Sequence, residues 1–380
     1  MNERVRVLRW GRLPFGLIGM LVLVAVLEGH LSRHDRDFTT VWASDWYRSG
    51  KAARREAAKC DILCFGDSLV KHSVIPRVLE ERLGRRVYNL AVFNGQAPTS
   101  YFLLRRAIEA GARPSAVLID GEVFESDPRT HARLWADLAT PGETLELARS
   151  ALDAGFFAKV ALARLIPSVK DRYELRANLL TNLRGEPSAT WAELSRHWRN
   201  WNINKGANIV PSIPSVPQAS IDELVQDNYL PSTWNCNPIN AIYVKKFLKL
   251  AESHAIPVVW LFPPYHPEVQ ARRDQGGHTA LFHRFVQTLQ AQYPTLVVVD
   301  GRHANYHPSA LYDKTHLNLQ GATVFSTDIA TILANLLDRK PTLESRWINL
   351  PTYQDPLVVP PVEDLEQSRI ALEDIATRRR

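Results

Sequence analysis

Short apolar runs alternate with amphipathic stretches along much of the chain. Five of the runs have the length and composition of buried strands, at residues 60–65, 87–92, 116–120, 257–262 and 296–300. Helical periodicity lies between them, at residues 75–84, 100–110 and 240–255, between the last two strands, and at 319–337. Because strands and helices alternate at short spacing, the pattern predicts an α/β fold, with a parallel sheet of about five strands between two layers of helices.

The alternation breaks after Asp120. From residue 121 to about residue 235 the pattern is helical, interrupted by a Pro- and Ser-containing loop at 210–217, and no strand pattern is found. A detour of this length between two strands of an α/β core is usually a cap grown from one loop. We therefore expect a helical cap that adds no strand to the sheet and overhangs the edge on which Ser68 lies.

Three tryptophans of this cap fall on one helical stripe, at Trp191, Trp198 and Trp201. Such a stripe has two interpretations. The rings could form the core of the cap, or they could form a surface on which sugars stack.

An apolar run of fifteen residues without a charge covers residues 13–27 and follows four arginines. With its flanks it reaches about 19 residues, which is just enough to cross a bilayer as a tilted helix. A cleaved signal peptide and a buried core helix are the alternatives, but no clear small-x-small cleavage site follows the run. The pattern favours an uncleaved transmembrane anchor at residues 13–31.

The arginines before this anchor predict its orientation. By the positive-inside rule, residues 1–12 form a cytoplasmic tip, and everything after about residue 32 lies outside the cytoplasm. The chain is then a single-pass protein of the cell (inner) membrane. We expect a helical stalk at 32–57 that packs on the domain, followed by a main domain at 58–338 with the cap inserted. The Pro-containing tail at 339–380 is expected to run over the surface, and only 363–377 of it has a helical pattern.

Composition and charge limit the classes of partner that the chain can be expected to bind. The chain has 380 residues, of which 45% are hydrophobic and 23% charged, as in ordinary globular proteins. Its net charge of +6 is concentrated at the two ends, with +3 in the first twelve residues and +3 in the last three. The body between them is neutral, so it lacks the basic surface that nucleic acids require, and we expect no nucleic-acid partner.

The three cysteines do not predict a disulfide framework or a metal site. Cys60 and Cys64 lie about 13 Å apart along a predicted strand, which is beyond disulfide reach and leaves Cys236 as the remaining partner for either. The sequence has no CxxC and no HExxH pattern, so no zinc site is indicated. We expect buried free thiols.

Polar residues and glycines directly follow the predicted strands. In chain order they are Gly66-Asp67-Ser68, Asn94-Gly95, Gly121-Glu122, Tyr265-His266, and a loop with Asp313 and His316. The carboxyl ends of parallel strands share one edge of the sheet, where ligands collect. A serine, an aspartate and a histidine are therefore expected to converge there.

These residue types fit nucleophilic catalysis. A serine hydroxyl needs a base, and the base needs an orienting carboxylate. The spacing D-x-x-H lets Asp313 hold one ring nitrogen of His316 while the other nitrogen faces Ser68. The backbone N–H groups of Ser68 and Gly95 are candidates for stabilising an oxyanion.

In these motifs the chain resembles the SGNH (GDSL-type) hydrolase family. The first family block is GDS, which is Gly66 to Ser68 in this chain. The second block is a glycine after the second strand, here Gly95. The last block is D-x-x-H before the C-terminal helix, here within DxxHxNxxG at 313–321. The similarity spans about residues 58–338. It implies a flavodoxin-like three-layer α/β/α fold, with Ser68, His316 and Asp313 as the catalytic triad.

The third family block departs from the pattern. The family typically has GxND there, whose asparagine completes the oxyanion hole, whereas this chain has Gly121-Glu122. Asn94 is a candidate replacement donor. In this respect, and in having one N-terminal anchor, the chain looks more like membrane-anchored SGNH-like proteins that work beside polysaccharide or teichoic-acid O-acylation machinery.

The resemblance implies a serine esterase or O-acyltransferase that acts on acyl esters, expected to belong to a cell-envelope glycan, without a metal or other cofactor. Asp67, Glu122 and His266 are candidate residues of the substrate pocket. The alternative is a non-catalytic glycan-binding accessory of a membrane-bound acyltransferase. Structural interpretations also stay open: Ser68 as a helix cap, Asp313 with His316 as a surface pair, and Asn94 as a turn residue.

Overall fold

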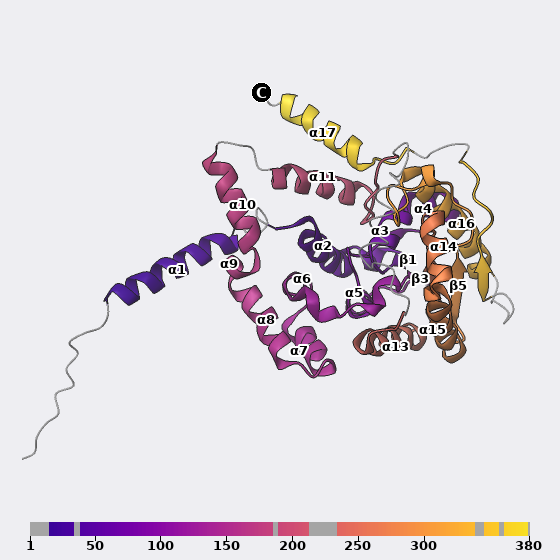
Figure 1. Ribbon diagram of the computed structural model, residues 1–380, viewed down its shortest axis with the longest axis horizontal. Coiled ribbons are helices and arrows are strands. Elements are labelled where there is room, and N and C mark those ends of the chain that lie inside the picture. Colours follow the sequence, from indigo (N-terminus) through magenta and orange to yellow (C-terminus); the bar gives the residue numbers. More distant parts are fainter. Residues whose placement is uncertain are drawn as a thin grey trace, which may run out of the picture.

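The computed structural model of the protein describes residues 15–33, 39–184, 189–212, 234–338, 346–356 and 361–378. Six parallel strands form its sheet, in the order β2-β1-β3-β4-β5-β6 (Figure 1). Their bounds are β1 Ile62–Cys64, β2 Val87–Asn89, β3 Ala116–Ile119, β4 Val258–Phe262, β5 Leu296–Asp300 and β6 Trp347–Asn349. The first five lie where the sequence predicts them, in the reversing order of doubly wound α/β sheets.

The sixth strand corrects the expected count of about five and the expected course of the tail. Trp347 pairs with Val298, and β6 extends the sheet beyond β5. The tripeptide Trp-Ile-Asn is half-buried to exposed and lies between prolines, so it has no apolar run that would predict a strand. Backbone pairing, rather than burial, makes this segment a strand.

Helices cover both faces of the sheet because the strands are buried on both sides. Leu63 and Phe65 face one core, whereas Ile62 and Cys64 face the other. The first core is covered by helices α2 Val41–Arg55, α5 Ala97–Glu109, α13 Pro238–Ser253 and α15 His278–Gln292; the second by α3 Ser68–Ser73, α4 Pro76–Leu83, α14 Pro267–Gln275 and α16 Leu319–Asp338. The result is a three-layer arrangement with the sheet in the middle (Figure 1).

Helix α2 and the short 3₁₀ helix η2 Ala57–Lys59 occupy the predicted stalk. The Thr40 side chain caps α2 by accepting a hydrogen bond from the Ala43 N–H. One face of the helix is buried, including Asp45, Trp46 and Ala53, and it packs against α5 and against a helix of the cap. This segment is therefore part of the folded domain.

In the described part of the predicted cap the regular elements are all helical, joined by turns and by an irregular segment at 207–212. They are η3 Glu122–Glu125, η4 Pro128–His131, α6 Ala132–Leu138, α7 Pro141–Ser150, α8 Ala154–Leu165, α9 Pro167–Lys170, α10 Arg172–Leu183 and α11 Ala189–Ile203. Strand β3 pairs directly with β4, with Val117 beside Val258. The prediction that the described part of the cap adds no strand is confirmed; most of the predicted 210–217 loop lies outside the described residues.

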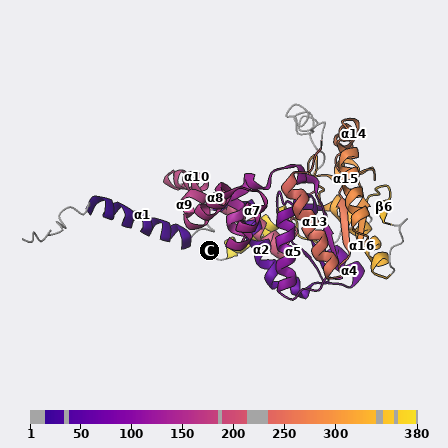
Figure 2. The ribbon, with the colours of Figure 1, turned by 90° about the horizontal axis from the view of Figure 1, so that it is seen from below.

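Helix α1 Phe15–Arg33 is long and apolar enough to cross a membrane, and it projects from the body of the molecule (Figure 2). Near its C-terminal end the Glu28 carboxylate accepts hydrogen bonds from the N–H and the hydroxyl of Ser168 in α9. The arginine cluster of residues 4–12 lies outside the described residues. At the other end of the chain, α17 Leu365–Arg378 lies along α11 and matches the helix predicted in the tail.

Candidate functional site

Ser68, His316 and Asp313 form a continuous chain of hydrogen bonds at the predicted sheet edge. The Ser68 hydroxyl lies 2.8 Å from His316 Nε2, and His316 Nδ1 lies 2.8 Å from an oxygen of Asp313. Because a carboxylate only accepts, Nδ1 carries the proton and Nε2 accepts from Ser68. This is the order of a nucleophile, its base and the group that orients the base.

Two glycines let the chain turn sharply at Ser68. Gly66 has φ of +127°, and a Cβ there would lie 2.2 Å from an oxygen of Asp120. A Cβ on Gly95 would lie 2.2 Å from the Gly66 carbonyl. The ends of β1, β2 and β3 therefore approach more closely than side chains allow. Asp67 then caps α3 by accepting from the Leu69 N–H at 2.7 Å, which places Ser68 at the first position of that helix.

A tight loop presents Asp313 and His316 from the same turn. The second oxygen of Asp313 accepts hydrogen bonds from the backbone N–H groups of Thr315 and His316, each at 2.8 Å. Asn318 closes the loop, because its amide donates to the carbonyl of Ser309 at 2.6 Å and its oxygen accepts from N–H groups at the start of α16. The pattern DxxHxN thus encodes one loop that fixes the carboxylate, the imidazole and the following helix.

These contacts keep Asp313 ionised. Burial by itself would raise the pKa of Asp313, but the hydrogen bond and charge of His316, with the two backbone N–H donors, lower it well below its ordinary value. An ionised carboxylate favours the imidazolium that forms when His316 accepts a proton. The site therefore has a base whose charged form is stabilised in advance.

His72, one turn after Ser68 on α3, packs against the base. Its ring lies edge-to-face with that of His316, with ring centres 4.9 Å apart. Its Nδ1 lies 2.6 Å from the carbonyl of Asn208, and since a carbonyl only accepts, this nitrogen carries the proton. Burial, followed by the neighbouring His316, lowers the pKa of His72 to about 3. His72 is thus a neutral ring that positions His316 without a competing charge.

A pair of buried carboxyl groups lies beneath the nucleophile. The Asp120 carboxyl, at the end of β3, accepts from the N–H of Asp67 at 3.1 Å and lies beside the Asp67 side chain. Burial and then repulsion by Asp67 raise the pKa of Asp120 far above its ordinary value. The buried site therefore favours the protonated form of the Asp120 carboxyl. Asp67, predicted as a pocket residue, caps α3 from inside the protein instead of facing substrate.

The predicted oxyanion donors differ in their availability. Ser68 N–H, at the first position of α3, has no hydrogen-bond partner among the described residues. Gly95 N–H donates to the Val92 carbonyl at 2.8 Å. The Asn94 amide contacts His131 Nε2, and Asn94 has a positive φ of 54°, as the turn interpretation expects. Of the three predicted donors, Ser68 N–H is thus unpaired among the described residues, whereas Gly95 N–H and the Asn94 amide already have partners within the protein.

The other predicted pocket residues serve contacts within the protein. Glu122 forms an ion pair with Arg273, a buried residue of α14. His266 caps α14 and is buried; its N–H donates to the carbonyl of Lys314 at 3.1 Å, inside the loop that bears Asp313. The backbone of His266 thus supports the loop that bears Asp313 and His316.

A buried ion pair ties α2 to the site. Lys71 Nζ, on α3, lies 2.7 Å from one oxygen of Asp45, and both side chains are inaccessible to solvent. The other oxygen of Asp45 accepts from the N–H of Phe93 at 3.0 Å, and Trp46 Nε1 donates to the Phe93 carbonyl at 2.8 Å. Helix α2 therefore fixes both backbone polar groups of the residue before Asn94.

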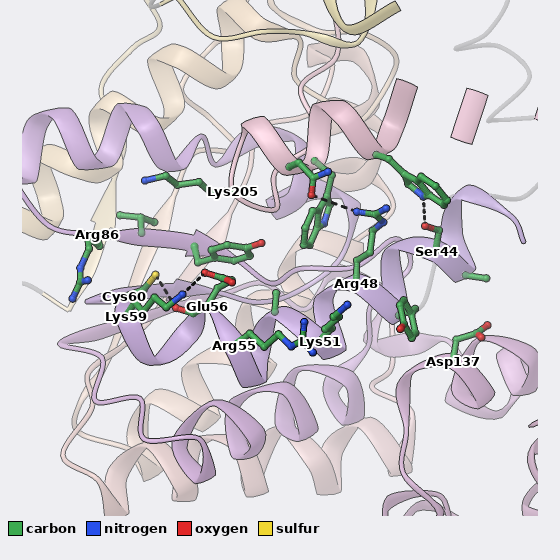
Figure 3. Close-up of a pocket in the computed structure, with 18 of the residues that line it drawn as sticks. Ser44, Arg48, Lys51, Arg55, Glu56, Lys59, Cys60, Arg86, Asp137 and Lys205 are labelled. Atoms are coloured by element: carbon green, nitrogen blue, oxygen red, sulfur yellow. Dashed lines mark hydrogen bonds and ion pairs between the residues drawn. The ribbon is translucent and has the colours of Figure 1, made fainter. Parts of the chain in front are cut away.

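A separate cavity of about 790 Å³ lies between α2, α11 and β2, away from the triad (Figure 3). Five aromatic, six basic and three acidic side chains line it, which gives a net charge of +3. Trp198 donates to the Ser44 hydroxyl, the Arg48 guanidinium lies 4.4 Å from its ring centre, and Trp201 is buried beside them. The tryptophan stripe thus packs on α2 and lines a cavity at the same time, while Trp191 is 45% exposed.

Sequence reasoning missed three groups of this site. Asp120 is the last residue of the apolar run AVLID. An acidic residue at the end of a buried strand was the signal that could have identified it as part of the site. His72 stands four residues after Ser68, on the same face of α3. Asp45 and Lys71 gave no signal, because their pairing depends on packing between segments far apart in the sequence.

Comparisons with known proteins add no relative to this description. No model of a known protein family matches the chain, and no curated protein matches it. What the site can do must therefore be argued from its geometry and from the motifs that build it.

Proposed function

We propose that the protein is a membrane-anchored serine esterase or O-acyltransferase that works outside the cytoplasm on acyl esters, with a cell-envelope glycan as the acyl donor or acceptor. The observation that carries the proposal is the chain of two 2.8 Å hydrogen bonds from Ser68 through His316 to Asp313. The resemblance of the GDS, glycine and DxxH motifs to SGNH hydrolases supports the same chemistry.

The proposed reaction has two steps. Ser68 Oγ attacks the acyl carbonyl carbon while His316 Nε2 takes the hydroxyl proton, and the tetrahedral intermediate collapses when His316 gives that proton to the departing alcohol. Water or a sugar hydroxyl then attacks the acyl-serine, losing its proton to His316, which returns it to Ser68. Water as acceptor gives hydrolysis, and a sugar hydroxyl gives transfer.

The oxyanion would be stabilised by Ser68 N–H and by a second donor that substrate binding brings into place. The Asn94 side chain is the proposed second donor, since it stands in the turn beside Gly95 and its present partner is the half-buried His131. Burial lowers the pKa of His131, so this partner is a neutral ring rather than a cation. A hydrogen bond to an oxyanion is stronger than one to a neutral ring, so the Asn94 amide would gain by leaving His131 for the oxyanion.

The proposed location rests on α1 and on the arginines before it. A periplasmic-type reporter fused after Arg380 should be active if the main domain is exported. An inactive fusion of this kind, with activity instead from a cytoplasmic-type reporter fused at the same position, would contradict the proposed orientation, and a protein released from membranes by salt alone would contradict the anchor.

Glycan binding without catalysis is the second candidate function, and the cavity between α2 and α11 favours it. Lys51 and Arg55 lie one turn apart on α2, line the cavity, and have no ion-pair partner among the described residues (Figure 3). Trp201 Nε1 is buried there without a hydrogen-bond partner in the described structure. Aromatic faces with unpaired cations suit an anionic sugar chain.

Charge reversal tests this candidate. Lys51→Glu with Arg55→Glu should weaken binding of an acidic oligosaccharide, such as oligogalacturonate, at least tenfold in calorimetry. Lys249→Glu with Arg284→Glu, on the outer faces of α13 and α15, is the matched control and should bind normally. Equal affinity of both double variants would exclude this cavity as a glycan site.

Labelling of the nucleophile tests the main proposal. A fluorophosphonate probe should label the full-length protein in detergent and should fail to label Ser68→Ala. Ser253→Ala, an exposed serine on α13, should label like the wild type. Absence of labelling in the wild type, together with absence of acyl-ester turnover, would favour the binding function over the enzyme.

A further inference from the structure

Helix α8 exposes apolar side chains on the face that turns away from the protein. Phe156, Val160 and Ala163 are buried on one side and pack toward α6 and α7. Leu162 and Leu165 lie on the other side, and Leu165 is 77% exposed. A helix that is apolar on both faces is normally buried on both, so the outer face of α8 lacks a partner among the described residues.

Helix α10 continues this apolar surface. Tyr173, Leu180 and Leu183 recur at helical spacing along one side, and Leu183 is 75% exposed. Val169 of the short helix α9 joins the exposed residues of α8 to those of α10. We call these residues the apolar foot: Leu162, Leu165, Val169, Tyr173, Leu180 and Leu183.

Basic side chains accompany the apolar foot. Arg172, Arg176 and Arg184 of the α10 segment are exposed, and the Arg172 guanidinium lies 4.6 Å from the ring centre of Tyr173. Exposed leucines beside arginines are typical of helices that lie in a membrane interface, with the leucines in the acyl-chain boundary and the cations among the phosphates. The composition therefore suits a lipid surface.

The apolar foot adjoins α1 at the level where a membrane surface is expected. Glu28 binds Ser168 of α9, and α1 contacts α9 directly (Figures 1 and 2). At a rise of about 1.5 Å per residue, Glu28 lies about 20 Å along α1 from Phe15, near the outer end of a helix that would span about 30 Å. Helices α8 to α10 then lie beside the anchor at the depth of the outer leaflet.

We propose that the apolar foot rests in the outer leaflet of the bilayer and holds the domain at a fixed height and tilt beside α1. The inference rests on α1 being inserted, as in the proposed function, but not on any catalytic step. Continuity with α1 selects the lipid surface over a second copy of the chain or another membrane protein, which the following test also distinguishes.

Site-directed fluorescence of the full-length protein in nanodiscs tests the proposal. Leu165→Cys and Leu183→Cys would each carry an environment-sensitive nitrobenzoxadiazole label, in discs of phosphatidylcholine and phosphatidylglycerol with or without doxyl-labelled lipid. Leu23→Cys in α1 is the control for insertion, and Ser253→Cys on α13 is the control for water exposure. Burial raises the pKa of Cys60 to about 11 and that of Cys236 to about 12, so the native thiols react slowly at pH 7, and unsubstituted protein gives their background.

We expect doxyl lipid to quench the labels at positions 165 and 183 severalfold, as at position 23, while aqueous iodide quenches only the label at 253. Quenching of the labels at 165 and 183 by iodide and not by doxyl lipid would show that the apolar foot lies in water. That result would overturn the proposal and leave the anchor intact. Protection of these labels from both quenchers would mean that protein covers this face, and that result also overturns the proposal of lipid contact. A label at 23 that doxyl lipid does not reach would refute the anchor and the foot together.

Discussion

His316 is held between three partners with fixed chemical roles. Asp313 accepts its Nδ1 proton, Ser68 donates to its Nε2, and the neutral ring of His72 packs on it. Each partner restricts the imidazole without offering a rival site for the proton. The arrangement is thus suited to one transfer, between Ser68 and the base.

Removing the nucleophile or the base should abolish acyl-ester turnover. We expect Ser68→Ala and His316→Ala each to lower kcat/KM by about three orders of magnitude or more, and the double variant to cost little beyond either, because the two act as a unit. Asp313→Asn should be milder, since it disturbs the tautomer of His316 without removing the base. Steady-state kinetics measures the effect, and thermal melting shows whether folding is kept. Wild-type turnover in Ser68→Ala would refute the assignment.

The raised pKa of Asp120 should make the stability of the protein depend on pH. Its pKa is raised in the folded protein, so the folded state keeps a proton that the unfolded state loses above about pH 4. Its contribution is complete below that pH and decreases as pH rises, by at most about 1.4 kcal/mol per pH unit. Asp120→Asn removes the titration but keeps an acceptor for Asp67 N–H, so its stability relative to the wild type should grow between pH 5 and pH 8. A difference in unfolding free energy that is constant with pH would contradict this.

Helix α2 connects the segment after α1 to the sheet edge on which Ser68 lies. Asp45 and Trp46 bind the backbone of Phe93, and Asp45 also neutralises Lys71 on the helix that begins with Ser68. The position of Asn94 therefore depends on a helix that precedes the sheet in the sequence.

Breaking this ion pair from one side should be more harmful than replacing it. Asp45→Asn leaves the buried Lys71 amine without its counter-charge, and we expect it to lower the free energy of unfolding by about 3–5 kcal/mol. Asp45→Asn combined with Lys71→Met removes both charges and should recover most of that loss. Chemical denaturation in detergent measures both. A double variant as unstable as the single one would show that packing, rather than charge, is lost.

The elements differ in how far the sequence predicted them. Strands β1 to β5 and the helix ending at Gly84 follow from local signals, namely short apolar runs and a glycine with φ of +62°. The triad was predictable because Ser68 directly follows the first predicted strand, and because the spacing D-x-x-H marks Asp313 and His316 in the loop after the fifth. Strand β6 and the pairing of Asp45 with Lys71 were not, because each depends on a distant segment that supplies its hydrogen bonds or its charge.

Segments that follow the predicted main domain extend its sheet and cover one of its helices. Strand β6 covers the edge of β5, and α17 lies along α11, where Glu363 pairs with Arg199 at 2.7 Å. The two ends of the sequence thus both contribute to the main domain, α2 at one core and β6 at the sheet edge.

Deleting residues 346–378 should make the domain aggregate. The edge of β5 would then present unpaired N–H and C=O groups on an apolar strand, which is a template for pairing between chains. Size-exclusion chromatography in detergent should show oligomers. A chain that ends at residue 372 keeps β6 and the first turns of α17, and should elute as the full-length protein does. Identical elution of the two truncated forms would contradict the role of β6.

Strand β6 also has a consequence for biosynthesis. A chain is made from its N-terminus, so in the proposed topology α1 enters the bilayer long before residues 347–349 leave the ribosome. Until they arrive, β5 is an open edge on a chain already tethered beside others in a two-dimensional layer. Completion of the fold is therefore coupled to completion of translation, and a stalled or prematurely terminated chain displays the surface that quality-control proteases and chaperones recognise.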